Sequence, residues 1–341
     1  MLKLLLILLF PISAVAQMMG GAYYDGVTKM QTGVLIAGST LSVSQKATLA
    51  YDSLHCKTVR INVVLSTYNG TLNAYDTYNA KGLTVVANVS YYTTGSLKPT
   101  LDPSLLSDFT AKLTQYVNDY HPAYVVVENE ELTKSYFYGP LINYVNEVAA
   151  AYAVCHPRGI LVINGGVGGI NSGVDVAVYR WLKTFNTAAA TDYGTHMSTG
   201  SLNAANNPGS NDTYEAYLRQ LDTLEGVKPY IDRFCRHTKE VLDNTGSDHS
   251  AVTIITGHQL QYQADYLRSR YNKLLVDNEG GSDNDQPALV AASMKEYMRC
   301  GFVLVQWWSG TGPGAEPLHD DATATINANG VAYKAFNDYI K

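Results

Sequence analysis

Short apolar runs alternate with amphipathic segments along nearly the whole chain of 341 residues, and this alternation constrains the fold more than any single motif. The runs are almost continuous in Val, Ile and Leu, which is typical of parallel strands buried on both faces. Eight segments have this character: 33–38, 58–65, 83–89, 123–129, 160–163, 193–197, 273–278 and 302–308. Eight strands that are each followed by a helix are the count of a (β/α)8 barrel.

The segments between these runs carry helix signals. In 104–120 an apolar residue recurs every four positions, which gives the helix one apolar face. Segments 140–154 and 287–298 begin with proline, which is well tolerated in the first turn of a helix. Because the chain contains no internal repeat, no low-complexity tract and no linker, we predict a single-domain α/β TIM barrel over residues 17–341.

One region does not fit the regular alternation. Between the sixth and seventh predicted strands the chain is longer than one loop and one helix require. Residues 201–211 are predicted as a polar loop, and 213–242 as a helix that is broken near Pro229. Residues 252–256 form a ninth strand candidate in a fold that needs eight, so we assign them to an insertion or to the entry of a helix.

The N-terminus has the pattern of a secretory signal peptide over residues 1–16. Lys3 supplies the positive start, an apolar run follows, and Ala14-Val15-Ala16 matches a cleavage site. The alternative is a membrane anchor, but the run is shorter than the roughly 20 residues that a span needs. We therefore expect a secreted or periplasmic protein that begins near Gln17 and has no membrane partner.

Composition excludes one class of partner and favours another. Charged residues are only 16% of the chain and the net charge is −6, so a basic surface for nucleic acid or anionic lipid is not expected. Tyrosine occurs 26 times and phenylalanine 7 times, so most aromatic rings carry a hydroxyl group. Aromatic faces rimmed by hydroxyls suit neutral sugars, which have an apolar face and many hydroxyls.

Cysteine and histidine spacing indicates no metal site. Four cysteines, none in a C-x-x-C pair, leave three complete disulfide pairings open in an exported protein. The interpretation that we favour is that they are small buried residues, three of them at the ends of helices. The histidines are scattered without H-x-H or H-E-x-x-H, so no metal and no cofactor is expected.

Two strand ends carry the same acidic motif. The fourth run ends in Val-Val-Val-Glu-Asn-Glu-Glu at residue 131, and the seventh in Leu-Val-Asp-Asn-Glu-Gly-Gly at residue 281. Chemistry in a barrel occurs at the carboxyl ends of the strands, and strands four and seven face one another. Facing carboxylates are what glycoside hydrolysis requires, since one protonates the leaving oxygen while the other attacks or activates water. Glu130 and Glu279 are the candidates.

With these motifs the chain resembles the clan A glycoside hydrolases, a superfamily of retaining (β/α)8 enzymes. The resemblance implies that Glu130 is the acid/base, Glu279 the nucleophile and Asn129 the ligand of the sugar 2-hydroxyl. It further implies that Arg60, in Val59-Arg60-Ile61, keeps the nucleophile ionised. The resemblance also places two side chains near the sugar: Trp308 at the end of strand eight, and a His or Tyr near the nucleophile, here His196 at the end of the sixth run. Glu131 follows Asn129-Glu130 where many members have proline, which leaves the individual family open.

Structural alternatives exist for each of these residues. Glu130 could instead be an acidic residue that opens a helix, and Glu279 a solvated residue of a turn. Arg60 could be a structural ion-pair partner. Of Trp307 and Trp308 one should face the mouth and the other pack outward, because side chains alternate along a strand.

The prediction is a secreted retaining glycoside hydrolase that acts on a neutral oligo- or polysaccharide without a cofactor. Tyr92 and Tyr136 are expected to line the mouth of the barrel and contact the sugar. The alternative is a non-catalytic carbohydrate-binding barrel on the same scaffold, and a more distant one is a metal-dependent hydrolase.

Overall fold

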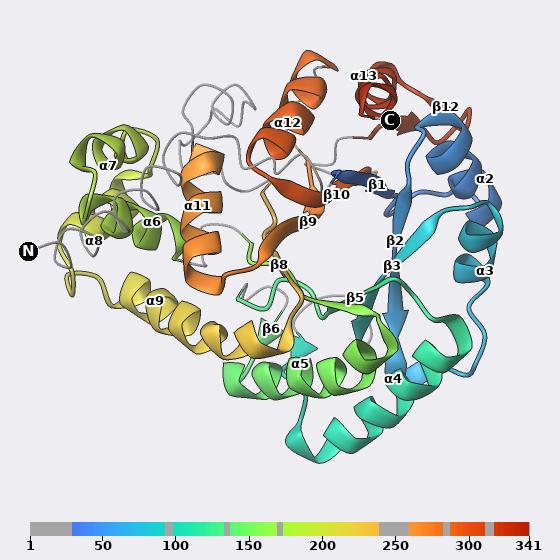
Figure 1. Cartoon of the computed structure of the whole chain (residues 1–341), viewed down its shortest axis with the longest axis horizontal. Coiled ribbons are helices and arrows are strands. Elements are labelled where there is room, and N and C mark those ends of the chain that lie inside the picture. The colour runs from blue at the N-terminus through green and yellow to red at the C-terminus, as the bar shows by residue number, and fades with distance from the viewer. Residues whose placement is uncertain are drawn as a thin grey trace, which may run out of the picture.

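The chain folds into one closed barrel of eight parallel strands (Figure 1). The computed structural model describes residues 29–92, 98–132, 137–168, 173–238, 259–281, 287–310 and 317–340. Around the barrel the strands follow in the order β1-β2-β3-β5-β7-β8-β9-β10, so each pairs with its neighbours along the chain. Their bounds are Gln31–Leu35, Thr58–Val64, Thr84–Ser90, Tyr124–Val127, Leu161–Asn164, Arg233–Cys235, Leu274–Gly280 and Phe302–Trp308. The predicted single (β/α)8 barrel is confirmed.

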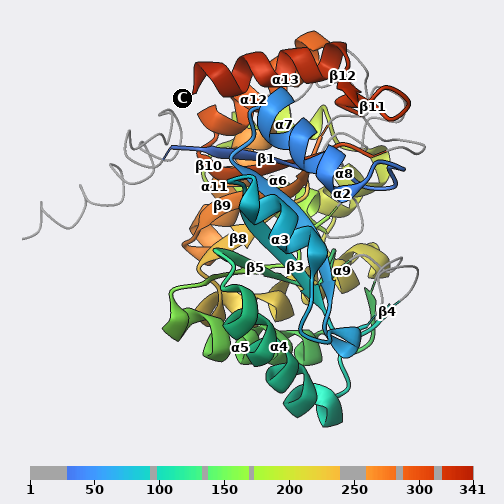
Figure 2. The same cartoon turned by 90° about the vertical axis from the view of Figure 1, so that its right-hand side faces the viewer.

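Helices surround the barrel on its outside (Figures 1 and 2). They are α2 Val43–Thr48, α3 Asn73–Ala80, α4 Leu106–Tyr120, α5 Leu141–Cys155, α6 Val174–Lys183, α7 Thr187–Gly194, α8 Thr199–Asn206, α9 Asp212–Leu224, α11 Gln259–Tyr271, α12 Pro287–Arg299 and α13 Ala328–Tyr339. Two short strand pairs lie outside the barrel: β4 Lys98–Pro99 with β6 Phe137–Tyr138, and β11 His319–Asp320 with β12 Thr325–Ile326. The three helices predicted near 104, 140 and 287 are confirmed.

The strands bury both faces, as their apolar sequences predict. One face of the strands fills the barrel interior with a cluster made of Val86, Val126, Ile163, Cys235, Val276 and Leu304. The opposite face packs against the helices in a second and larger cluster. On β3, for example, Val86 lies inside whereas Val85 and Ala87 lie outside, which is the alternation of a pleated strand. Interior positions nearer the carboxyl ends are polar, among them Asn88 and Gln306.

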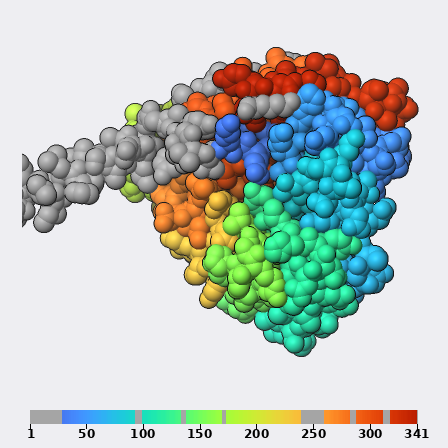
Figure 3. Space-filling view, turned by 45° about the vertical axis from the view of Figure 1, so that its right-hand side comes forward, coloured from blue at the N-terminus to red at the C-terminus, as the bar shows by residue number. Residues whose placement is uncertain are grey.

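The first and last strands close the barrel. β1 pairs with β10 in register from Gln31 opposite Leu304 to Leu35 opposite Trp308. Tyr333 on α13 donates a hydrogen bond of 2.6 Å from its hydroxyl to the carbonyl of Gly33. The blue β1–α2 segment and the red C-terminal segment accordingly lie against one another on the surface (Figure 3). The seam is thus fixed by both backbone pairing and a buried tyrosine.

The predicted sixth strand is wrong. Tyr193 and Gly194 end α7, and His196 and Met197 follow in turns that bond back to Tyr193 and Gly194. The sixth barrel strand is instead β8, which has three residues and pairs with β7 at Ile163 opposite Arg233. It was missed because so short a run has no periodicity. His196 therefore does not lie at a strand end, and that placement of it is corrected.

The rest of the region between β7 and β8 is helical. Residues 201–206, predicted as a polar loop, belong to α8, which Ser198 caps by accepting a hydrogen bond from the Ser201 amide. The helix predicted over 213–242 is α9 followed by a 3-10 segment at Glu225–Tyr230, and it gives way to β8 soon after Pro229. The ninth strand candidate at 252–256 lies outside the described residues.

All four cysteines are buried and unpaired. Burial raises the pKa of each thiol above its ordinary value, most weakly for Cys235. The interpretation of the cysteines as small buried residues is confirmed. The proposed signal peptide, residues 1–16, lies outside the described residues. Within the described ranges, no helix combines the length and apolarity that crossing a membrane requires.

A polar network in which Gln263 and Arg236 are buried and Asp175 is half-buried ties α7 to the barrel. Asp175 on α6 accepts hydrogen bonds from the Tyr193 hydroxyl at 2.7 Å and from the Gln263 amide at 2.8 Å. Gln263 in turn accepts one from the Arg236 guanidinium at 3.3 Å. Burial raises the pKa of Asp175, against the hydrogen bonds and the charge of Arg236, which lower it.

Asp175→Asn is expected to stabilise the protein increasingly as the pH rises. Asn retains the acceptor oxygen for both hydrogen bonds and removes a charge that burial disfavours. Because the pKa of Asp175 is higher in the folded than in the unfolded protein, the wild type loses stability as the pH rises from the unfolded pKa through the folded pKa. The difference in melting temperature between variant and wild type should therefore grow as the pH rises above the ordinary Asp pKa of about 4. Asp212→Asn, at an exposed position on α9, is the control, and an equal trend in both would contradict the role of burial.

Candidate active site

The chain turns sharply at the carboxyl end of β5. Glu128 and Glu130 have left-handed backbone conformations with φ of 60° and 48°, which non-glycine residues rarely adopt. Gly165, after β7, packs directly on this turn: a Cβ there would lie 2.8 Å from the carbonyl carbon of Glu128. The Gly165 carbonyl accepts a hydrogen bond of 3.2 Å from the Glu130 amide. The glycine therefore allows the close approach that holds Glu130 in place.

The three glutamates of this turn have different partners, and all three are buried. Glu128 accepts a hydrogen bond of 3.1 Å from the Tyr91 amide, and Glu131 accepts one of 2.8 Å from the Asn164 side chain. Burial raises the pKa of Glu131 to about 7, against the hydrogen bond of Asn164, which lowers it. Glu130 is the one whose carboxylate approaches Glu279.

Glu279 lies near the carboxyl end of β9 and is held from two sides. Asp277 accepts a hydrogen bond of 3.0 Å from the Glu279 amide, which fixes the backbone at the strand end. Arg60 on β2 donates to Glu279 Oε2 at 3.1 Å, and its other terminal nitrogen donates to Asn129 Oδ1 at 2.7 Å. The Glu279 side chain is 12% exposed and that of Arg60 3%, so this ion pair is largely shielded from water.

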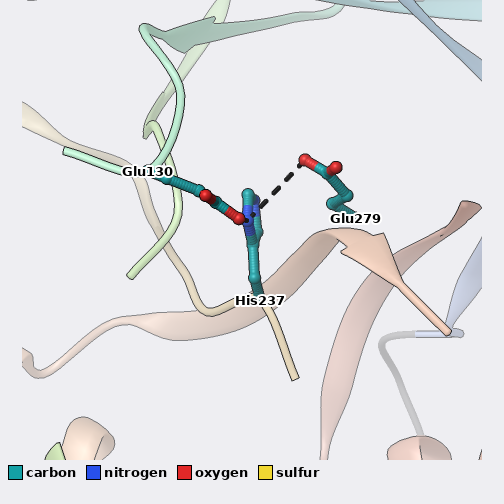
Figure 4. Close-up of side chains that lie close together, drawn as sticks. All are labelled: Glu130, His237 and Glu279. Atoms are coloured by element: carbon teal, nitrogen blue, oxygen red, sulfur yellow. Dashed lines mark hydrogen bonds and ion pairs between the residues drawn. The ribbon is translucent and has the colours of Figure 1, made fainter. Parts of the chain in front are cut away.

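Glu130 and Glu279 converge on His237, which follows β8 (Figure 4). The imidazole Nδ1 lies 3.0 Å from Glu130 Oε1 and 3.7 Å from Glu279 Oε2. One oxygen of each carboxylate and this nitrogen all lie within 4.8 Å of one another. Three strand ends, those of β5, β8 and β9, thus bring two carboxylates and one imidazole to a single point.

His237 is oriented by a third contact. Its Nε2 lies 2.5 Å from Asn278 Oδ1, so Nε2 donates and Nδ1 faces the carboxylates. Burial lowers the pKa of His237, but the hydrogen bonds with Cys235 and Glu130 and the charge of Glu279 raise it, and the net pKa is well above the usual value. The imidazole is therefore in its positively charged form, protonated on both nitrogens, when both carboxylates are ionised. Neither this residue nor its strand was predicted from the sequence.

The two tryptophans at the end of β10 lie on opposite faces. Trp307 is fully buried and packs edge-to-face on Tyr333, with ring centroids 5.8 Å apart. Leu304, Gln306 and Trp308 lie on the same face of β10 because side chains alternate along a strand. Leu304 belongs to the cluster in the barrel interior. Because the pairing of β10 with β1 is continuous from Leu304 to Trp308, the Trp308 side chain is on the interior face, at the mouth of the barrel.

The remaining predicted contacts fall in different places. Tyr92 comes two residues after the end of β3, where it is partly buried and its ring packs on Tyr91 with centroids 5.2 Å apart. Tyr136 lies outside the described residues. His196 is in the turn after α7, and the histidine near the end of the sixth strand is His237, two residues after β8. Arg60 and Asn129 are brought into one hydrogen-bonded group with Glu279.

Gly166→Ala is expected to displace His237 and to destabilise the protein. Gly166 has φ of 100°, and a Cβ there would overlap the His237 ring. We expect a loss of about 1 kcal/mol for the backbone and about 1–3 kcal/mol more for overpacking. Gly159→Ala is the matched control, because Gly159 has φ of 74° and no atom within 4 Å of the added Cβ. Urea unfolding measures both losses, and equal losses would contradict the packing argument.

Comparison with known proteins identifies the fold. No protein-family model and no curated protein matches the sequence. A solved glucosidase from Croceicoccus marinus is similar, with a TM-score of 0.58 at 10% identity over 92% of this chain and 68% of its own. A family 39 glycoside hydrolase from Bacteroides cellulosilyticus WH2 has 0.56 at 13%, over 92% of this chain and 64% of its own. A family 5 xyloglucanase from Paenibacillus pabuli has 0.53 at 14%, over 93% and 100%.

These neighbours are glycosidases with a (β/α)8 barrel. At such low identity the likeness concerns the fold, and at that level it confirms the resemblance that the strand-end motifs carry.

Proposed function

We propose that this chain is a retaining glycoside hydrolase that cleaves glycosidic bonds of a neutral oligo- or polysaccharide. Glu279 is the nucleophile and Glu130 is the general acid and base. The observation that carries the proposal is the separation of the two carboxylates, which have oxygens within 4.8 Å of one another. Retaining enzymes place their carboxyl groups about 5–5.5 Å apart, whereas inverting enzymes need about 6.5–9.5 Å to admit a water.

The charges around the pair support different roles for the two glutamates. The Arg60 guanidinium, 3.1 Å from Glu279, stabilises the ionised form that a nucleophile needs. Glu130 instead contacts His237 at 3.0 Å and has no contact with Arg60 among the described residues. A proton shared between Glu130 and His237 is the proton that the leaving group requires.

The reaction follows as two displacements. Glu279 attacks the anomeric carbon, the glycosidic C–O bond breaks, and the departing oxygen takes the proton of Glu130. Glu130 then removes a proton from water, the water oxygen bonds to the anomeric carbon, and Glu279 leaves with its electron pair. Two inversions give net retention of configuration.

Further residues are proposed to bind the sugar. Asn129 is oriented by the Arg60 bond to its Oδ1, which leaves its NH₂ group as a donor for the 2-hydroxyl. Trp308 offers an aromatic face to the sugar ring. Tyr92 and Tyr136 remain proposed contacts at the mouth. The solved glucosidase and xyloglucanase that share the fold act on glycans, as their names state, which supports a carbohydrate substrate here.

A substrate screen tests the proposal. The purified protein is incubated with aryl glycosides and polysaccharides, and the first-formed anomer is followed by proton NMR. Release of a sugar with retained configuration is expected. Release with inverted configuration would contradict the nucleophile role of Glu279. Binding without turnover across the panel would instead favour the carbohydrate-binding alternative.

We also propose that residues 1–16 are removed on export and that residues 17–341 are the catalytic domain. Intact-mass measurement of the protein recovered outside the cytoplasm is expected to give an N-terminus near Gln17. A mass that includes residues 1–16 would contradict cleavage.

A further inference from the structure

We propose that Glu130, His237 and Glu279 form an inhibitory binding site for a zinc-type divalent cation. The inference rests on the proposed function only in naming the consequence, which is loss of turnover. The cation itself needs no more than the donor set, since imidazole nitrogen and carboxylate oxygen are both ligand types that Zn²⁺ takes in proteins.

The distances suit a cation of this size. Zn²⁺ bonds to nitrogen and oxygen at about 2.0–2.2 Å, so neighbouring tetrahedral ligands lie roughly 3.3 Å apart. The imidazole nitrogen is 3.0 Å from one carboxylate oxygen and 3.7 Å from the other, and all three donors fit within 4.8 Å. Small rotations of the two glutamate side chains close the remaining difference. Three protein ligands leave the fourth position open for water.

The carboxylate oxygen of Glu130 that does not contact His237 is unsatisfied. Glu130 Oε2 is buried and has no hydrogen-bond partner among the residues described by the structure. An unpaired carboxylate oxygen in a buried site is unfavourable, and a cation that binds Glu130 through both oxygens removes this cost. This observation is independent of the spacing of the three donors.

The surrounding contacts already orient the ligands. Metal-binding histidines usually donate their other ring N–H to a neighbouring oxygen, and here Nε2 does so to Asn278 Oδ1 at 2.5 Å. Arg60 holds Glu279 Oε2, the oxygen that faces the imidazole. Hard cations such as Mg²⁺ and Ca²⁺ prefer six or more oxygens and are not expected to bind at this nitrogen-containing site.

Binding would block the reaction directly. The cation replaces the proton on His237 Nδ1, which is released to solvent, and occupies the electron pair of the nucleophile and the position of the acid proton. Inhibition by Zn²⁺ should therefore be competitive with the glycoside and reversed by a chelator.

Calorimetric titration with ZnCl₂ tests the site, using the chain without a histidine tag. We expect one Zn²⁺ per chain, and an affinity lowered more than about tenfold in His237→Asn and in Glu279→Gln. Glu279→Gln is isosteric and its side chain is 12% exposed, so it tests the site even if the buried His237→Asn fails to fold. His156→Asn is the matched control, because His156 also faces a carboxylate, Asp232, at 3.1 Å but is half exposed.

Two results would overturn the proposal: no one-to-one Zn²⁺ binding in the wild type, or an affinity unchanged in a folded Glu279→Gln variant. Turnover in excess chelator is measured in parallel. If the wild type hydrolyses glycosides and the Zn²⁺ affinity of Glu279→Gln equals that of the wild type, the cation site is rejected and the hydrolase proposal stands. Zn²⁺ binding that is lost in the variants, together with no turnover on any glycan, rejects the hydrolase proposal and leaves the cation site standing.

Discussion

Glu279→Gln is expected to lower the rate of aryl glycoside hydrolysis by about 10⁴-fold or more. The amide keeps the shape of the side chain but cannot form the covalent bond to the anomeric carbon. Loss of a covalent nucleophile removes a whole reaction path, so its effect exceeds that of a positioning contact. The measurement is initial-rate release of the aryl alcohol at saturating substrate, with the melting temperature recorded for the same sample.

Azide provides a positive test of the same role. In Glu279→Ala, azide can enter from the side that the carboxylate occupied, and a single displacement gives a glycosyl azide of inverted configuration. Glu225→Gln is the control for Glu279→Gln: Glu225 is also paired with an arginine, Arg270, but it is 48% exposed, so the wild-type rate is expected. Wild-type rates in a folded Glu279→Gln variant would reject the proposed mechanism.

Glu130→Gln is expected to have an effect that depends on the leaving group. For an alkyl glycoside, whose oxygen must be protonated as it departs, the loss should be about 10²–10⁴-fold. For a dinitrophenyl glycoside, whose anion leaves without a proton, cleavage of the bond should be nearly unaffected. The second step then becomes rate-limiting because water is no longer activated, so a burst of dinitrophenol is expected before a slow steady state.

Glu131→Gln tests whether the general-acid role belongs to Glu130 alone and not to the adjacent Glu131. Glu131 follows Glu130 in the chain and is also buried, but its carboxylate binds the Asn164 side chain at 2.8 Å. Gln retains an acceptor oxygen for that bond, so we expect no burst and no dependence on the leaving group. In Glu130→Ala, azide should give a glycosyl azide of retained configuration, the opposite of the Glu279→Ala product. The same product configuration in both variants would contradict the two roles.

Most of the barrel could be predicted because seven of its strands are apolar runs of four or more residues. β8 could not, since Arg233-Phe234-Cys235 is too short for a periodic signal and is separated from the preceding 3-10 segment by only two residues. Tyr193–Met197 has an alternating pattern, but Tyr193 is fully buried by tertiary contacts with α6 and α11 rather than by a sheet. In both cases tertiary packing outweighed the local pattern.

The site could be predicted as far as the strands were. Arg60, Asn129, Glu130 and Glu279 were located from strand ends, and the structure brings them into one group of hydrogen bonds and ion pairs with His237. His237 was missed since its position depends on β8. The signal that could have found it is a His two residues after a short Phe-Cys pair, downstream of Pro229 in the broken helix. The distinction among Glu128, Glu130 and Glu131 required the backbone turn itself.

The four buried, unpaired cysteines allow local unfolding of the chain to be followed by thiol labelling. They lie after the π-helical turn that follows α2, at the end of α5, in β8 and before β10, so each reports on a different sector. A thiol reagent that reaches only exposed sulfur should label them at rates set by local unfolding. Cys235, in the barrel interior, should be labelled last and only with global unfolding. The order of labelling, read by mass spectrometry of peptides, would rank the stability of the sectors without any substitution in the chain.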